Sequence, residues 1–177
     1  HQTDEQKEDM RRVFSPLLSK YKDLDFVAVW FITAAHYIQS TGAQAAFVST
    51  NSITQGEQVA MLWPLVASAG VEIGFAHLSF KWANSAANNA GVTCVVVGLR
   101  RRSSAPKFIF DAGLSRRVKN INAYLIAADD VIVEKRAKQI SALPKMDYGN
   151  KPTDGGNFIL SRDERDELIT AYPASRA

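Results

Sequence analysis

The chain has 177 residues, of which 46% are apolar, 22% charged and 10% aromatic, a composition that excludes global disorder and fibrous repeats. At about 150 residues per domain, this length allows one compact domain with an appendage. The net charge of +3 is unevenly spread: residues 1–99 carry 6 basic and 8 acidic side chains, whereas residues 100–177 carry 15 and 10, so the second part is the basic one.

Capping signals predict the first and the last helix. Thr3 precedes an acidic first turn and Gln6 follows it at the spacing of a capping box, which predicts a helix over about residues 4–14. Ser161 and Glu164 have the same spacing and predict the start of a final helix.

Two further helices are predicted from apolar residues at helical spacing. The first covers about residues 25–40, and Gly42 follows it as a stop signal. The second covers about residues 55–69 and contains Pro64, which should bend or shorten it. Because the apolar surface of the first is wide, we expect that helix to be mostly buried.

Three strands are predicted among these helices. Residues 45–48 form a short uncharged run, which is typical of a buried parallel strand. Residues 71–80 and 92–99 predict two strands that pair as an antiparallel hairpin. The order of elements predicts an α/β fold, but a doubly wound sheet normally has more strands. The sequence therefore indicates part of a larger protein, whose exposed apolar surface should favour self-association.

After residue 99 the α/β pattern stops. We divide the chain into residues 1–104 and an irregular, basic α+β extension over residues 105–177. In this extension, residues 103–106 are predicted as a linker. Residues 107–110 and 131–133 are short strands at best, and residues 148–157 form a loop rich in Gly, Asn, Asp and Pro.

The sequence lacks the motifs of several function classes. It has no G-x-G-x-x-G, P-loop, H-E-x-x-H or G-x-S-x-G pattern. The single cysteine, Cys94, lies among valines as a small core residue, and with three scattered histidines it argues against a disulfide or a metal site. His36 and His77 are interpreted as hydrogen-bonded structural histidines. We find no membrane span and no export signal, so we expect no membrane partner and a cytoplasmic location.

Aromatic and basic side chains gather at the end of the predicted strand 71–80. Phe80, Lys81 and Trp82 follow one another there, and α/β sheets bind ligands at the carboxyl ends of their strands. Two interpretations stay open. Either an aromatic ring stacks on a nucleobase while Lys81 contacts phosphate, or both rings belong to the core or to a lid contact.

Basic residues form three clusters in the second part of the chain. They suit phosphate contacts if they share a face of the molecule, and a solvated surface is the alternative. The clusters are Arg100-Arg101-Arg102, Arg116-Arg117-Val118-Lys119 and Lys135-Arg136-Ala137-Lys138.

Four runs of the sequence carry a resemblance to a known family. They are residues 24–30, 46–59, 75–84 and 148–157, and the most specific reads Phe-Val-Ser-Thr-Asn-Ser-Ile-Thr-Gln-Gly-Glu-Gln. Together they resemble the second half of large bacterial DNA adenine-N6 methyltransferases. Many members of that family are single-chain type II restriction-modification enzymes, in which the methyltransferase domain is joined to a nuclease and a target recognition domain.

The resemblance implies a fold and a domain division. The strand ending at residues 49–51 would be the fifth of a Rossmann-like class I methyltransferase sheet, and strands 71–80 and 92–99 its closing antiparallel pair. Residues 1–104 would be the second half of the catalytic domain, and residues 105–177 a linker and the start of the target recognition domain. The family's glycine-rich cofactor motif and its Asn-Pro-Pro-Phe tetrapeptide occur nowhere in this sequence.

The resemblance also implies roles for residues and partners. Phe80, with Trp82 as the alternate, matches the aromatic residue that packs against the flipped adenine. S-adenosylmethionine would supply the methyl group in the full-length protein and the tetrapeptide would hold the exocyclic amine, whereas this fragment would bind no cofactor. Double-stranded DNA and the missing half of the same protein are the implied partners. Lys81 and Arg100, Arg101 and Arg102 would contact phosphates flanking the pocket, with further DNA contacts from Arg116, Arg117, Lys119 and Lys151.

Three functions follow, in this order. The first is a fragment of a DNA adenine methyltransferase that is inactive in isolation. The second is a non-catalytic nucleic-acid-binding module in which Phe80 and Trp82 hold single strands. The third is a fragment of a methyltransferase that acts on protein or RNA. We interpret the Gly-rich residues 149–157 as a rigid turn between domains rather than a base-reading segment.

Overall fold

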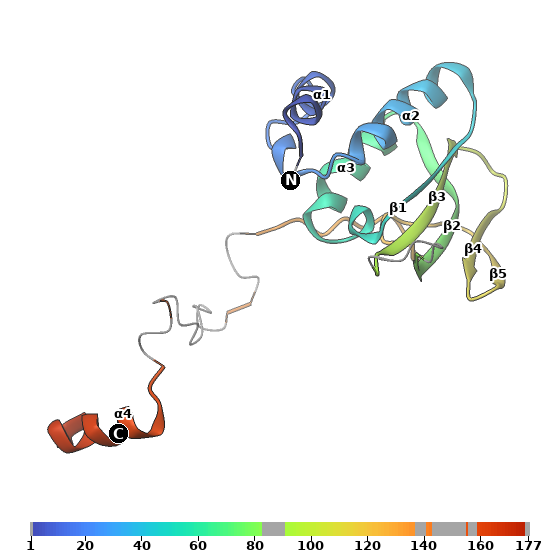
Figure 1. The fold of residues 1–177 in the computed structure, drawn as a ribbon. Helices are drawn as coiled ribbons and strands as arrows, with labels where there is room; N and C mark the ends of the chain where they lie inside the picture. Colours follow the sequence, from blue (N-terminus) through green and yellow to red (C-terminus); the bar gives the residue numbers. More distant parts are fainter. Residues whose placement is uncertain (1, 83–90, 137–140, 143–154, 156–158, 176–177) are drawn as a thin grey trace. The chain divides into compact units, whose positions relative to one another are not determined.

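The computed structural model describes residues 2–82, 91–136, 141–142, 155 and 159–175 (Figure 1). The chain divides into two compact units, His1–Lys135 and Arg136–Ala177. The elements of the first unit are α1 (Asp4–Phe14), the 3₁₀ turn Tyr21–Asp23, α2 (Ala28–Thr41), β1 (Ala45–Thr50), the 3₁₀ turn Asn51–Thr54, α3 (Gly56–Ser68), β2 (Val71–Lys81), β3 (Thr93–Arg101), β4 (Lys107–Asp111) and β5 (Leu114–Val118).

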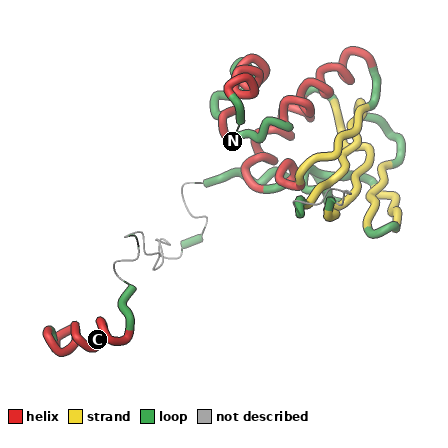
Figure 2. The backbone as a smooth tube through the Cα atoms, viewed as in Figure 1, coloured by secondary structure: helices red, strands yellow, loops and turns green. Residues whose placement is uncertain are grey.

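Five strands form one mixed sheet in the order β1-β3-β2-β4-β5 (Figure 2). β3 is antiparallel to both β1 and β2, β4 is parallel to β2, and β5 is antiparallel to β4. β1, β2 and β4 therefore run in one direction, and their carboxyl ends lie at the same edge of the sheet. The predicted α/β class and the antiparallel pair formed by β2 and β3 are confirmed.

The prediction of a buried parallel strand is wrong for β1. This strand pairs with β3 in antiparallel register, from Ala45 opposite Leu99 to Thr50 opposite Cys94. Its side chains alternate between covered and exposed positions. An uncharged run does not distinguish a strand buried on both faces from one with a single covered face, which is why the sequence pattern misleads here.

The sheet also continues beyond the point where the sequence pattern stops. β4 corresponds to the short strand that is predicted at residues 107–110, whereas residues 131–133 form no strand. β5 escapes the sequence pattern because its side chains, Leu-Ser-Arg-Arg-Val, are almost all exposed and do not alternate. The turn between β4 and β5 uses Ala112 and Gly113, both with positive φ, as tight hairpin turns do. The predicted domain boundary at residue 104 falls between strands of this one sheet. The division into a catalytic part and a target recognition part stays a prediction.

α2 and α3 cover one face of the sheet and form the core with it (Figure 2). Phe31 of α2 meets Phe47 of β1 and Trp63 of α3, with ring centroids 5.0 and 5.8 Å away. The indole N–H of Trp63 donates to the carbonyl oxygen of Ile53 at 2.9 Å, which satisfies its polar atom in the core. The predicted middle helices are present, and Pro64 stays inside α3. The prediction that α2 is mostly buried is wrong, because fewer than half of its residues are buried and its outer side faces solvent.

The opposite face of the sheet carries apolar and aromatic side chains that are exposed or half-buried, and we call it the aromatic face: Val48, His77 and Phe108 are exposed, and Phe75 and Phe110 are half-buried. His77 stacks on Phe110 with ring centroids 4.5 Å apart and planes 14° from parallel. Phe75 lies so close to β3 that a Cβ built on Gly98 would be 2.1 Å from its ring. Glycine at position 98 is therefore a requirement of this close approach.

A cluster of charged side chains lies at the amino end of β2. The Glu72 carboxylate accepts hydrogen bonds from Arg100 Nε and Lys107 Nζ, both at 2.9 Å, and all three side chains are nearly buried. Lys107 also donates to Asn120 Oδ1 at 2.6 Å, and Asn120 donates to Asp130 Oδ1 at 2.8 Å. This charge cluster ties β2, β3 and β4 to the segment that follows β5.

The first and the last predicted helices begin at capping boxes. In α1, Gln6 N–H donates to Thr3 Oγ1 at 3.2 Å, while Thr3 N–H donates to Gln6 Oε1 at 3.0 Å. In the second unit, α4 (Arg162–Ala171) begins at Ser161, whose hydroxyl accepts from Glu164 N–H at 3.3 Å. Among the described residues, no helix combines the length and apolarity needed to cross a membrane.

Replacing Gly98 by alanine should destabilise the first unit by about 1 to 3 kcal/mol, because the new methyl group cannot fit under the Phe75 ring without moving the sheet. Urea unfolding followed by circular dichroism measures the loss. Gly91→Ala is the matched control, since nothing lies within 4 Å of a Cβ at that position. An unchanged free energy of unfolding for Gly98→Ala would show that Phe75 does not pack this way.

Removing the carboxylate of Glu72 should destabilise the protein by about 3 kcal/mol at neutral pH, because two nearly buried cations lose their partner. Burial raises the pKa of Glu72, but hydrogen bonds from Lys107 and Arg100 outweigh this effect and hold the pKa below its ordinary value. Its contribution is therefore present above the ordinary glutamate pKa and lost as the pH falls through the lower folded-state pKa.

The Glu72→Gln variant should accordingly unfold at a lower urea concentration than the wild-type protein at pH 7. When the pH is lowered, its free energy of unfolding should fall less than that of the wild type, because it has no carboxylate at this position to protonate. Glu8→Gln is the control, because Glu8 pairs with Arg11 on the exposed surface of α1 and such pairs stabilise little. Equal effects of the two substitutions would contradict the assignment.

Candidate functional site

The carboxyl edge of the sheet brings the ends of β1 and β2 together around the start of β3. Thr50 of β1 and Phe80 of β2 both pair with Cys94, and Lys81 pairs with Thr93. Paired residues point to the same face of a sheet, and neighbouring strands are about 4.8 Å apart. Thr50, Cys94 and Phe80 therefore form one row about 10 Å long, with the small thiol in the middle.

Two aromatic rings stand exposed on the β2 side of this row. Phe80 is 37% exposed and Trp82 41% exposed, with ring centroids 6.5 Å apart and planes inclined by 40°. The backbone N–H of Trp82 donates to the carbonyl of Val92 at 2.8 Å, which extends the pairing of β2 and β3 past Lys81. The rings of Phe80 and Trp82 thus lie together and are accessible to a planar ligand, whereas the side chain of Lys81 between them points to the other face of the sheet.

A chain of polar side chains lies on the β1 side of the same row. Ser52 Oγ donates to Asp25 Oδ2 at 2.7 Å and lies 2.9 Å from Thr50 Oγ1. Gln58 holds the segment before α2, since it accepts from Asp25 N–H at 2.9 Å and donates to the carbonyl of Asp23 at 2.8 Å. The sequence interpretation assigns no role to these side chains, although the run Ser-Thr-Asn-Ser directly after a strand is a signal that could have drawn attention to them.

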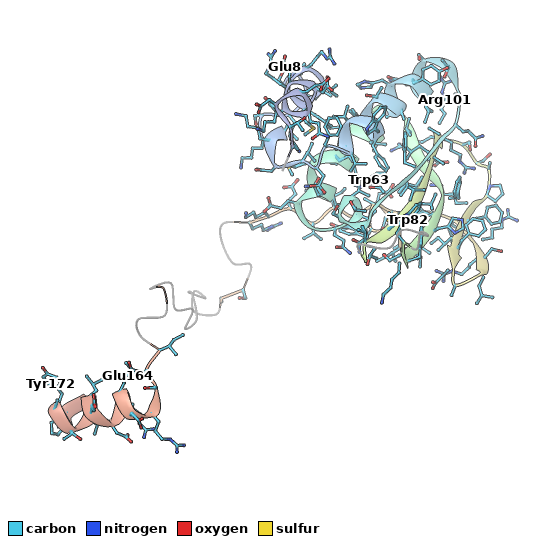
Figure 3. All side chains as sticks on the ribbon, viewed as in Figure 1. Glu8, Trp63, Trp82, Arg101, Glu164 and Tyr172 are labelled. Carbon is cyan, nitrogen blue, oxygen red and sulfur yellow. The ribbon has the colours of Figure 1, made fainter. Side chains whose placement is uncertain are left out.

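The first basic cluster lies at the other end of the sheet. Arg100 pairs with Glu72 and Arg101 with Val71, at the opposite end of β2 from Lys81, and Figure 3 shows Arg101 and Trp82 at opposite ends of the strands. The prediction that Lys81 and this cluster flank one pocket is therefore wrong. Proximity to strand 92–99 in the sequence does not indicate which end of the strand a residue occupies, because β3 runs antiparallel to β2.

Within that cluster the three arginines have different surroundings. The guanidinium of Arg100 has three acceptors in the protein: Glu72 Oε1, the carbonyl of Pro106 at 3.1 Å and that of Ala105 at 2.6 Å. Arg101 donates to the carbonyl of Gln39. Arg102 is exposed, and its backbone N–H donates to the carbonyl of Gly70 at 2.9 Å. Whether any of them contacts phosphate stays a prediction.

The second basic cluster lies on the edge strand β5 and directly after it. Arg116 pairs with Ile109 and Arg117 with Phe108, and both arginines are exposed, as is Lys119. As neighbours on a strand, Arg116 and Arg117 point to opposite faces, so they do not belong to one surface. Lys151 lies outside the described residues.

Other predicted residues and cavities do not form a second site. Cys94 is buried, as expected. His36 and His77 are exposed, and His77 stacks on Phe110, so their interpretation as hydrogen-bonded structural histidines stays a prediction. A cavity of about 280 Å³ adjoins the charge cluster, whose polar groups are already paired with one another. No group of three metal-ligating side chains occurs in the described part of the chain.

Comparison with known proteins identifies two domain families in the chain. Residues 1–111 match the model of the MmeI DNA-methyltransferase domain, and residues 127–177 match the model of the MmeI target recognition domain. The chain is 42% identical over 173 residues to DNA methyltransferase A of Bacillus subtilis (strain 168), a match that covers 97% of this chain and 20% of that protein.

A solved structure gives the same relation. The chain resembles the Type IIL restriction-modification enzyme MmeI, solved in complex with DNA, with 48% sequence identity and a TM-score of 0.84 over 99% of this chain and 24% of that one. The chain thus spans about a fifth to a quarter of the length of these relatives. Because the methyltransferase model alone matches more than half of the residues, the chain belongs to the MmeI family of restriction-modification DNA methyltransferases.

Proposed function

We propose that this chain is the second half of an adenine-N6-specific DNA methyltransferase domain and the start of its target recognition domain, within a protein that uses S-adenosylmethionine. The observation that carries the proposal is the exposed pair of Phe80 and Trp82 at the carboxyl edge of the sheet, in a chain of this family. The order β1-β3-β2, with β3 antiparallel between two parallel strands, supports a Rossmann-like methyltransferase sheet. Such a protein would act in the cytoplasm, together with its DNA.

The proposed chemistry divides between this chain and the rest of the protein. An adenine inside a duplex cannot present its amino group to a methyl donor, so the base is flipped out and held by stacking. Phe80 supplies the stacking face, and Trp82 beside it is the alternate. The sequence contains neither the glycine-rich cofactor motif nor Asn-Pro-Pro-Phe, and we propose that other parts of the protein supply both.

The proposed DNA contacts come from exposed basic side chains. Lys81 follows Phe80 in β2 and its exposed side chain points to the other face of the sheet, so we propose that it contacts a backbone phosphate beside the flipped nucleotide rather than the stacked base. Further contacts are proposed for Arg101, Arg102, Arg116, Arg117, Lys119 and Lys151. For Arg100 a phosphate contact would have to compete with three acceptors that the protein already supplies.

A non-catalytic nucleic-acid-binding module is the second candidate, and the exposure of Phe80 and Trp82 favours it. The distribution of charge argues against it. The first two basic clusters lie at the amino end of β2 and on β5, so they do not line one groove with the two rings.

The aromatic face points to the missing half of the same protein as a partner. Sheets with parallel strands are normally covered on both faces, and here only one face carries helices. Val48 is 52% exposed and Phe108 37% exposed on the other. In the full-length protein we expect this face to be covered.

Replacing Phe80 by alanine in the full-length protein should lower kcat/KM for methyl transfer roughly 5- to 150-fold, the value of one base-stacking contact. Once the methylated site is mapped, 2-aminopurine at the target adenine reports flipping by its fluorescence, which Phe80→Ala should reduce. Phe80→Tyr should retain most of the methyl transfer and most of the fluorescence signal, and the isolated chain should transfer no methyl group.

Tyr37→Ala is the control, because Tyr37 is an exposed aromatic residue on α2. Full activity of Phe80→Ala, or methylation of RNA or protein instead of DNA, would overturn the proposal.

The isolated chain should self-associate through the aromatic face, with a sedimentation coefficient that rises with concentration. The double substitution of Val48 and Phe108 by serine should shift it toward the monomer, because both side chains are exposed there. Tyr37→Ser removes an equally exposed apolar side chain on another surface and should leave association unchanged. A stable monomer at all concentrations would contradict this expectation.

A further inference from the structure

The segment that follows β5 packs onto the first unit although it contains no helix or strand, and we call its residues 119–135 the strap. It contributes three buried apolar side chains to the core: Ile121, Ala123 and Leu125. Leu125 is buried with a φ of 58°, a left-handed conformation that residues with a side chain rarely adopt. Such a conformation persists only where the surrounding structure fixes it, so the strap follows one defined path.

Two asparagine side chains hold the first part of the strap. Asn122 Oδ1 accepts from two backbone N–H groups of the strap, at 3.0 and 3.1 Å, and its amide donates to a strap carbonyl at 3.3 Å. Asn120 accepts from Lys107 Nζ at 2.6 Å and donates to the carbonyl of Ala128 at 3.0 Å. Because Lys107 belongs to β4 and to the charge cluster, these bonds tie the strap to the sheet.

The second part of the strap ends at the first turn of α3. Ile132 packs against the core, and the backbone N–H of Val133 donates to the Tyr124 hydroxyl at 2.9 Å. Lys135 Nζ lies 2.6 Å from Glu57 Oε1, in the first turn of α3. The hydrogen bond from Glu57 holds the pKa of Lys135 above its ordinary value. The strap therefore has one anchor on the sheet and a second on α3.

Two boundaries that divide this chain do not coincide at the strap. The match to the target recognition domain begins at residue 127, whereas the compact first unit continues to Lys135. Residues 127–135 thus belong to the recognition domain by their sequence and to the first unit by their contacts. The turn of α3 that they reach also carries Gln58, which holds Asp25 on the polar side of the candidate site. The beginning of the recognition domain is therefore fixed close to that site.

We propose that the strap determines the sequence specificity of methyl transfer by fixing the point at which the recognition domain leaves the methyltransferase part, with Glu57, Lys135 and Tyr124 as positioning residues. They act through the strap and do not touch the reacting base. Contacts to base edges specify a sequence only if they meet the same base pairs whenever the base at Phe80 is flipped. A loose strap would let the recognition domain meet neighbouring base pairs as well. The inference rests on the proposed function and deepens it.

The test uses the full-length protein, once its methylated sequence has been mapped. Lys135→Ala and Glu57→Gln should each lower the preference for that sequence over one with a single changed base pair by about 2- to 5-fold, the effect of one exposed ion pair. The double substitution should lower it no further, because both changes remove the same contact. Lys135→Arg should restore the preference. The kcat at saturating DNA should change little, whereas a mere loss of stability would lower kcat and leave the preference unchanged.

Hydrogen exchange of residues 127–135 gives a readout that does not depend on activity. Tyr124→Phe removes the acceptor of the Val133 N–H, so it should speed this exchange and lower the preference, and Lys135→Ala should do the same. Arg11→Ala is the matched control, because it removes one positive charge and one exposed ion pair from α1 and should change neither.

The outcomes separate the inference from the proposed function. If the wild-type protein methylates its DNA sequence but the strap variants leave the preference unchanged, the inference is wrong and the proposed function stands. A lower preference without faster exchange would indicate that Lys135 contacts DNA directly, which also overturns the inference. If the wild-type protein methylates no DNA, the proposed function fails and the inference fails with it.

Discussion

The structure depends on the position of β3, which is hydrogen-bonded to β1 on one side and to β2 on the other. Because β3 is antiparallel to both, β1 and β2 run in the same direction and end at the same edge. One residue of β3, Cys94, pairs with Thr50 and with Phe80, and this shared partner sets the distance between the polar and the aromatic side of the site. A shift of β3 by one residue would turn its own side chains, including Cys94, to the opposite face, so Thr50 and Phe80 would no longer share this small residue as their partner.

The two ends of the sheet have opposite chemistry. At the amino end of β2, Glu72 is shared by Arg100 and Lys107, and their charges are satisfied inside the protein. At the carboxyl end, Phe80 and Trp82 are exposed, and the hydroxyls of Ser52 and Thr50 extend a polar chain from Asp25. Buried charges need partners, so a charged side chain in a basic run can serve stability rather than binding. Arg100 is therefore a poor guide to the DNA-binding surface, although it belongs to the most basic run of the chain.

Local signals in the sequence predicted the local structure. Capping boxes at Thr3 and Ser161 mark the starts of α1 and α4, since the side chains that satisfy the first N–H groups lie within three residues. The strand pairing of 71–80 with 92–99 was likewise predictable from pattern. Contacts between distant residues were not: nothing near Arg100 in the sequence announces Glu72, and nothing near Ser52 announces Asp25. Phe80, by contrast, was identified because a family resemblance and its place at a strand end agree.

The first unit has a closed hydrophobic core of its own. The core under α2 and α3 is closed by side chains of this chain alone, from Phe31 to Trp63. The aromatic face and the rings at the carboxyl edge are exposed on other surfaces. The helices on one face of the sheet and the pairing of its strands fix the positions of Thr50 and Phe80. Under the proposed function, the rest of the protein would complete a site whose edge this chain already positions.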